Sequence, residues 1–109
     1  MPRSSNVRGE LRRGIPFKDG ILSVQASVDH YSIPRANDAT YVAVEVAYIK
    51  NDKFAPVPGW DKVYDDDVYP TVNISKVIDT LLDQYDLPTI LSYIPPVDKV
   101  ILKDYVEKL

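Results

Sequence analysis

The chain has a single histidine, the residue type most often used for acid–base catalysis near neutral pH. A catalytic histidine needs an orienting carboxylate and a nucleophile or substrate within reach. Asp29 precedes His30 at the end of an expected strand, where neighbouring side chains point to opposite faces. The two side chains are therefore not expected to pair, and we interpret His30 as a polar residue at a strand end.

Three consecutive aspartates could supply the oxygen ligands that a hard cation prefers. They are Asp65, Asp66 and Asp67. A calcium loop spreads its ligands over alternate positions and has a glycine at the turn, whereas this run is contiguous and has no glycine nearby. The run is better interpreted as a solvated acidic loop, which could also receive a basic segment from a neighbouring subunit.

Other signatures of enzymes are missing from the sequence. There is no cysteine, which excludes disulfides, thiolate metal sites and cysteine catalysis. The four glycines do not approach the spacing of a phosphate-binding loop, and no nucleophile elbow accompanies the histidine. We therefore expect a protein that is not an enzyme and has no cofactor or metal, with catalysis by carboxylates alone left open.

Charge is distributed unevenly along the chain. Residues 1–18 contain five basic residues and one acidic residue, whereas residues 19–109 contain eight and fifteen. Prolines and glycines interrupt the first segment, so we predict a basic, flexible N-terminal arm that can order on a partner. Its candidate partner-binding residues are Arg3, Arg8, Arg12, Arg13 and Lys18.

The arm suggests nucleic acid as one possible partner. Its cations could neutralise phosphates, and Phe17, Tyr31, Tyr41 or Tyr48 could stack on bases. The acidic remainder of the chain would repel a phosphate backbone, so such binding would be weak and salt-sensitive.

Aromatic residues are frequent between positions 53 and 70, where prolines indicate a loop. Tyrosine and tryptophan combine an apolar ring with a polar tip and are enriched at interfaces. These residues form either a partner-binding patch or a satellite cluster packed under the loop, and both alternatives stay open. The residues concerned are Phe54, Trp60, Tyr64 and Tyr69.

Two strands should position these candidate residues. Residues 40–50 are rich in valine, and residues 41–49 are apolar on both faces with Glu45 the one interruption, which is typical of a strand covered on both sides. Residues 21–29 alternate between apolar and polar, as a half-buried strand does. We predict that the two strands form an antiparallel hairpin.

Helices should follow in the C-terminal third. An apolar stripe at helical spacing predicts a helix over residues 74–86, capped by Asn73 or Ser75 and stopped by Pro88. Its outer face is acidic, through Asp79, Asp83 and Asp86. Residues 89–94 could add one or two turns, and residues 97–109 predict a terminal helix, although residues 100–102 could pair as a strand instead.

These elements predict an α+β fold: a small, mainly antiparallel sheet of two to four strands, with two or three C-terminal helices packed on one face. Residues 19–109 would form this single domain. The helices would cover one side of strand 41–49, leaving its other side and the sheet edges exposed. We therefore expect a second copy, or another protein, to complete the packing.

The sequence thus favours a non-enzymatic assembly or binding protein that acts as a homo-oligomer. Its organisation is similar to that of small viral (phage) structural or accessory proteins, in which a terminal arm contacts a neighbouring subunit. Alternatives are a nucleic-acid-binding protein that uses the arm, and an inhibitor whose acidic residues mimic phosphates. No apolar run approaches the ~20 residues of a membrane span, and no secretory signal is recognisable, so we expect a cytoplasmic or virion protein without membrane contact.

Overall fold

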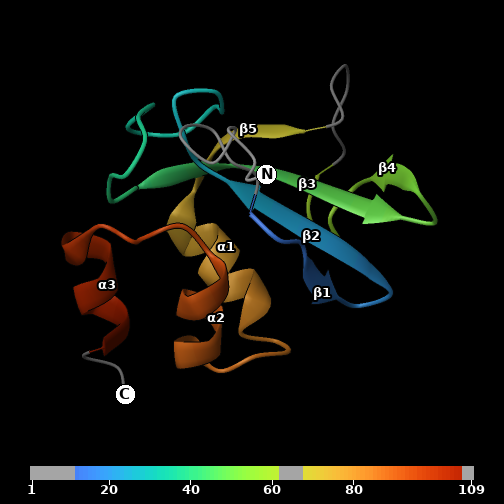
Figure 1. The fold of residues 1–109 in the computed structure, drawn as a ribbon. Coiled ribbons are helices and arrows are strands. Elements are labelled where there is room, and N and C mark those ends of the chain that lie inside the picture. Colours follow the sequence, from blue (N-terminus) through green and yellow to red (C-terminus); the bar gives the residue numbers. More distant parts are fainter. Residues whose placement is uncertain (1–11, 62–67, 107–109) are drawn as a thin grey trace, which may run out of the picture.

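The valine-rich segment forms the central strand of a five-stranded antiparallel sheet, β3 (Ala43–Lys50) (Figure 1). β2 (Gly20–Gln25) pairs along one side of β3, and β1 (Ile15–Phe17) adds to the far side of β2. β4 (Lys53–Ala55) and β5 (Tyr69–Asn73) share the other side of β3, each pairing with one half of it. The computed structural model describes residues 12–61 and 68–106.

Two short turns close the hairpins β1–β2 and β3–β4 at the same end of the sheet. Asn51 and Asp52 both have positive φ, as the central residues of a two-residue type I′ hairpin turn must. Lys18 has a φ of 54° in the other turn. An ion pair of 2.9 Å between Lys50 Nζ and Asp19 Oδ2 joins the two turns.

Three C-terminal helices complete the α+β fold that the sequence predicted: α1 (Ile74–Leu81), α2 (Leu87–Tyr93) and α3 (Lys99–Val106). They lie on one side of the sheet (Figure 1). The predicted apolar stripe is confirmed over the length of α1, whose four stripe residues are fully buried. The core lies between this helical layer and the facing side chains of β2 and β3.

The predicted helix over residues 74–86 ends five residues early, because a turn follows Leu81 and a new helix starts after Asp86. The Asp86 carboxylate accepts a hydrogen bond of 3.0 Å from the Thr89 N–H and so caps α2. Pro88, which was expected to stop a helix, instead lies in the first turn of α2, where its missing N–H has no intrahelical partner to lose.

The terminal segment is a helix over Lys99–Val106, and not the alternative strand. None of its residues is fully buried, and it lies beside α1 and α2 at the margin of the layer (Figure 1). The Tyr105 hydroxyl donates to Ser75 O at 3.0 Å and to Asp79 Oδ1 at 2.8 Å, which ties α3 to α1.

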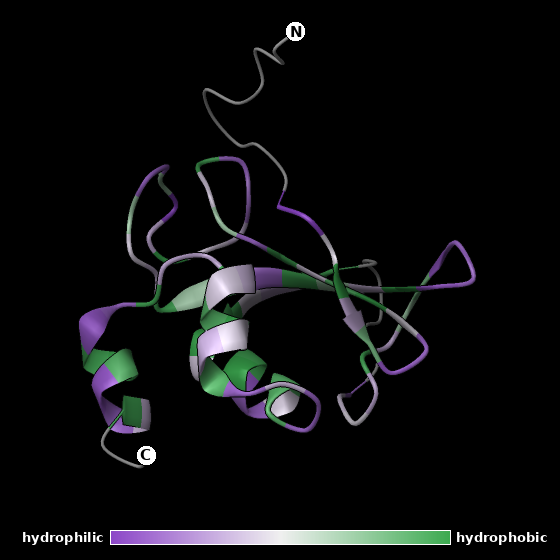
Figure 2. Ribbon diagram, turned by 60° about the horizontal axis from the view of Figure 1, so that its bottom comes forward, coloured by the Kyte–Doolittle hydropathy of each residue, from purple (hydrophilic) through white to green (hydrophobic). Residues whose placement is uncertain are grey.

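The expectation that one side of strand 41–49 stays exposed is wrong for Ala43 and Ala47, whereas Ile49 on the same side is half-buried between the exposed Ile21 and Phe54. Ala43 and Ala47 point away from the helices, yet their exposed fractions are only 1% and 7%. These side chains are small enough for the chain itself to cover them, and Ile33 from the β2–β3 loop lies beside Ala43 in an antiparallel bridge. Figure 2 shows hydrophobic residues concentrated in the strands and helices, with the hairpin turns hydrophilic.

The end of the predicted arm belongs to the sheet. Ile15 and Phe17 of β1 are buried in the core, although they fall inside the predicted 1–18 arm. The strand has only three residues and contains Pro16, which an edge strand tolerates. Residues 1–11 of the predicted arm lie outside the described residues.

β4 and β5 were likewise expected to be irregular, and they bring the sheet to five strands, one more than the upper expectation. β5 contains Pro70 and Thr71, whose φ is 51°, and its register with β3 shifts between Val44 and Val46. Such a bulge lets a strand with an irregular backbone continue to pair.

Candidate functional site

Four apolar residues lie in direct register across four strands of the sheet. Pro16 is opposite Ile21, Ile21 is opposite Ile49, and Ile49 is opposite Phe54. Directly opposite residues of antiparallel strands point to the same face. Their neighbours Leu22 and Tyr48 are buried on the helix side, so these four residues point away from the helices. We call Pro16, Ile21, Ile49 and Phe54 the apolar row.

The apolar row is accessible. Ile21 is 45% and Phe54 is 52% exposed, whereas Ile49 between them is half-buried. Gly14 leaves space for Ile21, because a methyl group at Gly14 would lie 2.3 Å from Cγ2 of Ile21. The position of Ile21 is therefore fixed by its packing on Gly14, and the large apolar side chains of the row are exposed to solvent.

The two hairpin turns beside the row carry charges of both signs, from Lys18, Asp19, Lys50, Asp52 and Lys53. The hydrogen bond from Lys50 lowers the pKa of Asp19 and raises that of Lys50. Both groups are exposed, so we expect this pair to add little stability. The pair does, however, hold the two charged hairpin turns next to each other beside the row.

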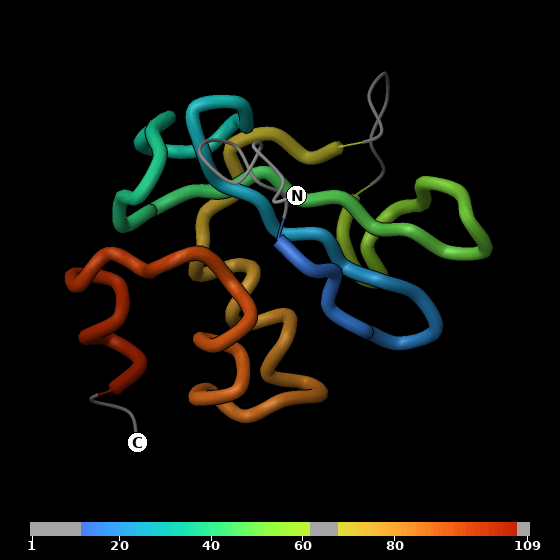
Figure 3. Tube along the Cα trace, viewed as in Figure 1, coloured from blue at the N-terminus to red at the C-terminus, as the bar shows by residue number. Residues whose placement is uncertain are grey.

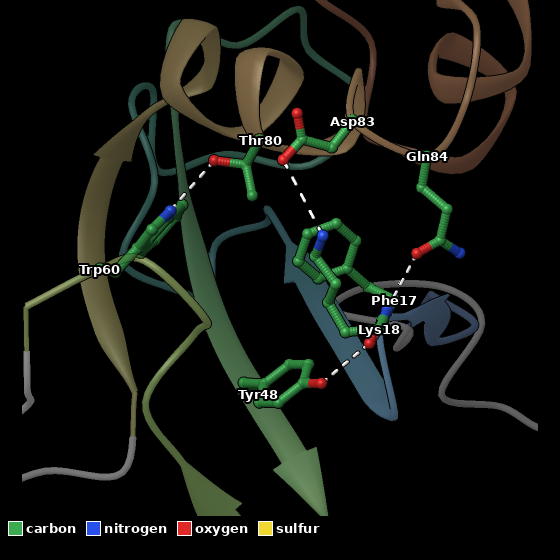
Figure 4. A network of polar contacts seen from close by, with 7 residues as sticks. All are labelled: Phe17, Lys18, Tyr48, Trp60, Thr80, Asp83 and Gln84. Atoms are coloured by element: carbon green, nitrogen blue, oxygen red, sulfur yellow. Dashed lines mark hydrogen bonds and ion pairs between the residues drawn. The ribbon is translucent and has the colours of Figure 1, made fainter.

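Tyr48 holds the two hairpins together from the buried side. Its hydroxyl donates to Phe17 O at 2.8 Å (Figure 4). The same hydroxyl lies 3.5 Å from Asp19 Oδ1. Burial, followed by the negative charge of Asp19, raises the pKa of Tyr48. The hydroxyl therefore stays protonated at neutral pH and acts as a fixed donor between β3 and β1.

The outer edge of β1 is closed by the turn between α1 and α2. The Lys18 N–H donates to Gln84 Oε1 at 2.9 Å (Figure 4). Gln84 Nε2 in turn donates to Pro16 O at 3.2 Å. The Tyr85 hydroxyl also donates to Pro16 O. These contacts use backbone groups that another strand would need for pairing, so strand addition at this edge is disfavoured.

The described part of the predicted arm is held close to the sheet. Gln25 binds the backbone of Arg12 twice: its Oε1 accepts from the Arg12 N–H at 2.7 Å, and its Nε2 donates to Arg12 O at 3.0 Å. The side chains of Arg12 and Arg13 are exposed, whereas Lys18 lies 4.0 Å from Asp83. Arg3 and Arg8 lie outside the described residues.

The predicted aromatic residues do not form one patch among the described residues. Trp60 and Tyr69 pack edge to face at 5.1 Å, and Trp60 Nε1 donates to Thr80 Oγ1 at 3.0 Å (Figure 4). Lys76 Nζ lies 4.6 Å from the Trp60 ring centroid. These contacts correspond to the satellite-cluster alternative, whereas Phe54 belongs to the apolar row. Tyr64 lies outside the described residues.

The three described residues of the predicted acidic face each have a structural contact. Asp79 accepts from Tyr105, Asp83 pairs with Lys18, and Asp86 caps α2. The hydrogen bonds from Thr89 lower the pKa of Asp86. Asp65, Asp66 and Asp67 lie outside the described residues.

His30 is buried within a local polar cluster of the β2–β3 loop and is not a strand-end residue. Its Nδ1 lies 2.6 Å from Ser27 Oγ, which also accepts from the Asp29 N–H at 3.0 Å. Ser32 joins the cluster by donating to Ser27 O at 3.3 Å. All of these contacts lie within six residues of one loop, so we interpret the cluster as stabilising the conformation of the loop.

No described residues form a group of three or more histidine, aspartate or glutamate side chains that could hold a metal ion. Within residues 12–61 and 68–106, no helix has the length and apolarity needed to cross a membrane. No protein-family model, curated protein or solved structure matches this chain.

The apolar row was missed at the level of sequence because it depends on register. Asn51–Asp52 carried a usable signal, since a two-residue turn there places Ile49 opposite Phe54. The turn at Lys18–Asp19 similarly places Pro16 opposite Ile21. The two hairpin registers, combined with the pairing of Ile21 and Ile49, align the four residues.

Proposed function

We propose that the protein is a non-enzymatic assembly protein that self-associates through the apolar row, with one sheet face against another. The observation that supports this most is the register of the row: four apolar residues in line across β1, β2, β3 and β4, on the face without helices. A sheet face of this kind is usually buried against another layer.

A second copy fits the row by symmetry. A two-fold axis parallel to the strands, lying between two stacked sheets, places Ile21 against Ile49 of the second copy and Pro16 against Phe54. Two sheets pack in this way about 10 Å apart. The same axis places the β1–β2 turn of one copy against the β3–β4 turn of the other, where charges of both signs can pair.

The size of the row predicts a weak interaction. The largest apolar patch on a typical monomer covers about 300–600 Å², whereas a standard interface buries about 800 Å² from each partner. The row would form the centre of the interface, and the hairpin turns would supply the rest. We therefore expect a dimer with a Kd in the micromolar range, roughly −8 kcal/mol.

Association through the edge of β1 or of β5 is less favourable than association through the face. At β1 the contacts of Gln84 and Tyr85 occupy the backbone groups. At β5 the Thr71 N–H already donates to Tyr31 O at 3.0 Å. The open apolar surface of the sheet is therefore its face.

Sedimentation velocity over a range of protein concentrations tests the proposal. We expect the average mass of the wild type to rise with concentration and that of Phe54→Lys to stay monomeric, because a lysine would bring charge into the row. Val100→Lys is the matched control, since Val100 is exposed on α3, away from the row.

A wild type that stays monomeric at the highest concentration would contradict the proposal. Equal loss of association in Phe54→Lys and Val100→Lys would also contradict it, because the effect would then not be specific to the row. The nucleic-acid-binding and inhibitor alternatives, and the likeness to viral proteins, stay predictions.

A further inference from the structure

The β2–β3 loop lies at the end of the sheet opposite the hairpin turns (Figure 3), and it exposes Arg35 and Tyr31. We propose that Arg35 and Tyr31 form a recognition site for a carboxylate that lies beside an apolar side chain of a partner protein. This inference does not rest on the apolar row, because it concerns other residues and another ligand.

Two contacts fix the Arg35 guanidinium. Its Cζ lies 4.9 Å from the centroid of the Tyr31 ring, and its Nε donates to Val28 O at 3.1 Å. The two terminal nitrogens have no hydrogen-bonding partner among the described residues, and the ion pairs there join other groups. A guanidinium held in this way can bind both oxygens of a carboxylate through its terminal nitrogens.

Three apolar side chains of the same loop are exposed, and one of them, Tyr31, packs on the guanidinium. Val28, Tyr31 and Ile33 are 40%, 51% and 49% exposed. Tyrosine and arginine are enriched among the residues that contribute most to protein–protein binding. The combination suits a ligand that presents an apolar group next to its negative charge.

The loop is already ordered, although it exposes these side chains. The Tyr31 N–H donates to Glu45 Oε2 at 3.1 Å, and Tyr31 O accepts from the Thr71 N–H at 3.0 Å. Ile33 exchanges backbone hydrogen bonds with the start of β3, and Ser27 and His30 fix the first half of the loop. A preformed loop loses little conformational entropy on binding, which favours recognition.

Local charge favours a single carboxylate over a polyanion. Asp38 is exposed on the same loop, and the Glu45 carboxylate lies at the Tyr31 N–H. These acidic groups would repel a nucleic-acid backbone, whose binding requires several phosphates to be neutralised. A single carboxylate can instead pair with the Arg35 guanidinium, while an adjacent aliphatic side chain of the ligand contacts the apolar residues of the loop.

Nuclear magnetic resonance titration with a matched peptide pair tests this site. The probes are acetyl-Leu-Asp-Leu amide and acetyl-Leu-Asn-Leu amide, which differ by one charge, and inorganic phosphate. We expect the aspartyl peptide to shift the Arg35 Nε–H signal and the amide signals of Tyr31 and Ile33. Binding of the asparaginyl peptide and of phosphate should be about tenfold weaker.

Two conservative variants complete the experiment. Arg35→Lys keeps the charge but removes the planar pair of donors, so binding of the aspartyl peptide should fall about tenfold. Arg13→Lys makes the same change at another exposed arginine and should leave binding unchanged. The backbone amide spectrum of each variant verifies that the fold is intact.

Four results would overturn the proposal: no shift with millimolar aspartyl peptide, equal binding of the asparaginyl peptide, unchanged binding by Arg35→Lys, or phosphate binding as tight as the peptide. The last would instead indicate a phosphate ligand. Phe54→Lys should bind the peptide normally, so failure of self-association and failure of this site are separable.

Discussion

The hydroxyl of Tyr48 should contribute measurably to stability, because it joins the two hairpins that carry the apolar row. The side chain is buried, and the hydroxyl donates to Phe17 O across 31 positions of sequence at 2.8 Å. Tyr48→Phe keeps the ring and removes only this donor, so no cavity of consequence forms. The loss of a buried hydrogen bond costs about 1–2 kcal/mol.

For a domain of this size, the corresponding fall in Tm is roughly 5–15 °C. Tyr93→Phe is the control, because the Tyr93 hydroxyl has no hydrogen bond among the described residues and its ring packs on Tyr85 at 5.6 Å. We expect the control to change the free energy of unfolding by less than about 0.5 kcal/mol. Urea unfolding followed by circular dichroism measures both variants against the wild type.

An equal denaturant midpoint for Tyr48→Phe and Tyr93→Phe would refute this reasoning. It would mean that the hydroxyl contributes no more than an exposed one. The positions of the hairpins, and so of the apolar row, would then have to depend on the strand pairing alone. A lower m-value in Tyr48→Phe would indicate a different effect, namely a change in the surface exposed on unfolding.

Two further variants test other contacts by the same unfolding assay. Gly20→Ala places a methyl group 2.5 Å from the Tyr48 ring and 2.7 Å from Ile49 O, so we expect a loss of about 3 kcal/mol. Gly59→Ala, with a φ of 89° and open space around it, should cost only about 1 kcal/mol, and equal losses would contradict the packing around Gly20. Burial, followed by the hydrogen bond to Asp79, raises the pKa of Tyr105 from 10.0 to about 12. The protonated Tyr105 hydroxyl therefore contributes to stability below about pH 10, and this contribution is lost as the pH rises toward 12. Between about pH 9 and pH 11 the wild type should therefore lose more stability than Tyr105→Phe, and parallel losses would show that this group does not govern the change.

The fold was predictable from sequence where one periodic pattern spans a whole element. The valines of β3 and the stripe of α1 repeat over two or more turns or pleats, and packing on the core reinforces the same pattern. β1 and β5 are short and contain Pro16 and Pro70, so their own residues do not indicate strands. Their conformation comes from pairing with β2 and β3, which a local pattern does not reveal.

The candidate surfaces were less predictable than the fold. Phe54 and Trp60 are six positions apart, yet one lies on the open face of the sheet and the other against α1. The acidic residues of the predicted outer face proved to serve as cap and hydrogen-bond acceptor, because single turns and side-chain contacts fix them. Arg35 gave no signal in the sequence, since its stacking on Tyr31 depends on the path of an irregular loop.

The closure of β1 by Gln84 also has a consequence for the order of folding. The hydrogen bond from Lys18 to Gln84 joins residues 66 positions apart, and contacts of such separation form slowly because a long chain must first be confined. During synthesis β1 leaves the ribosome long before the turn that completes its edge. β1 is thus made well before it can gain its full set of native contacts.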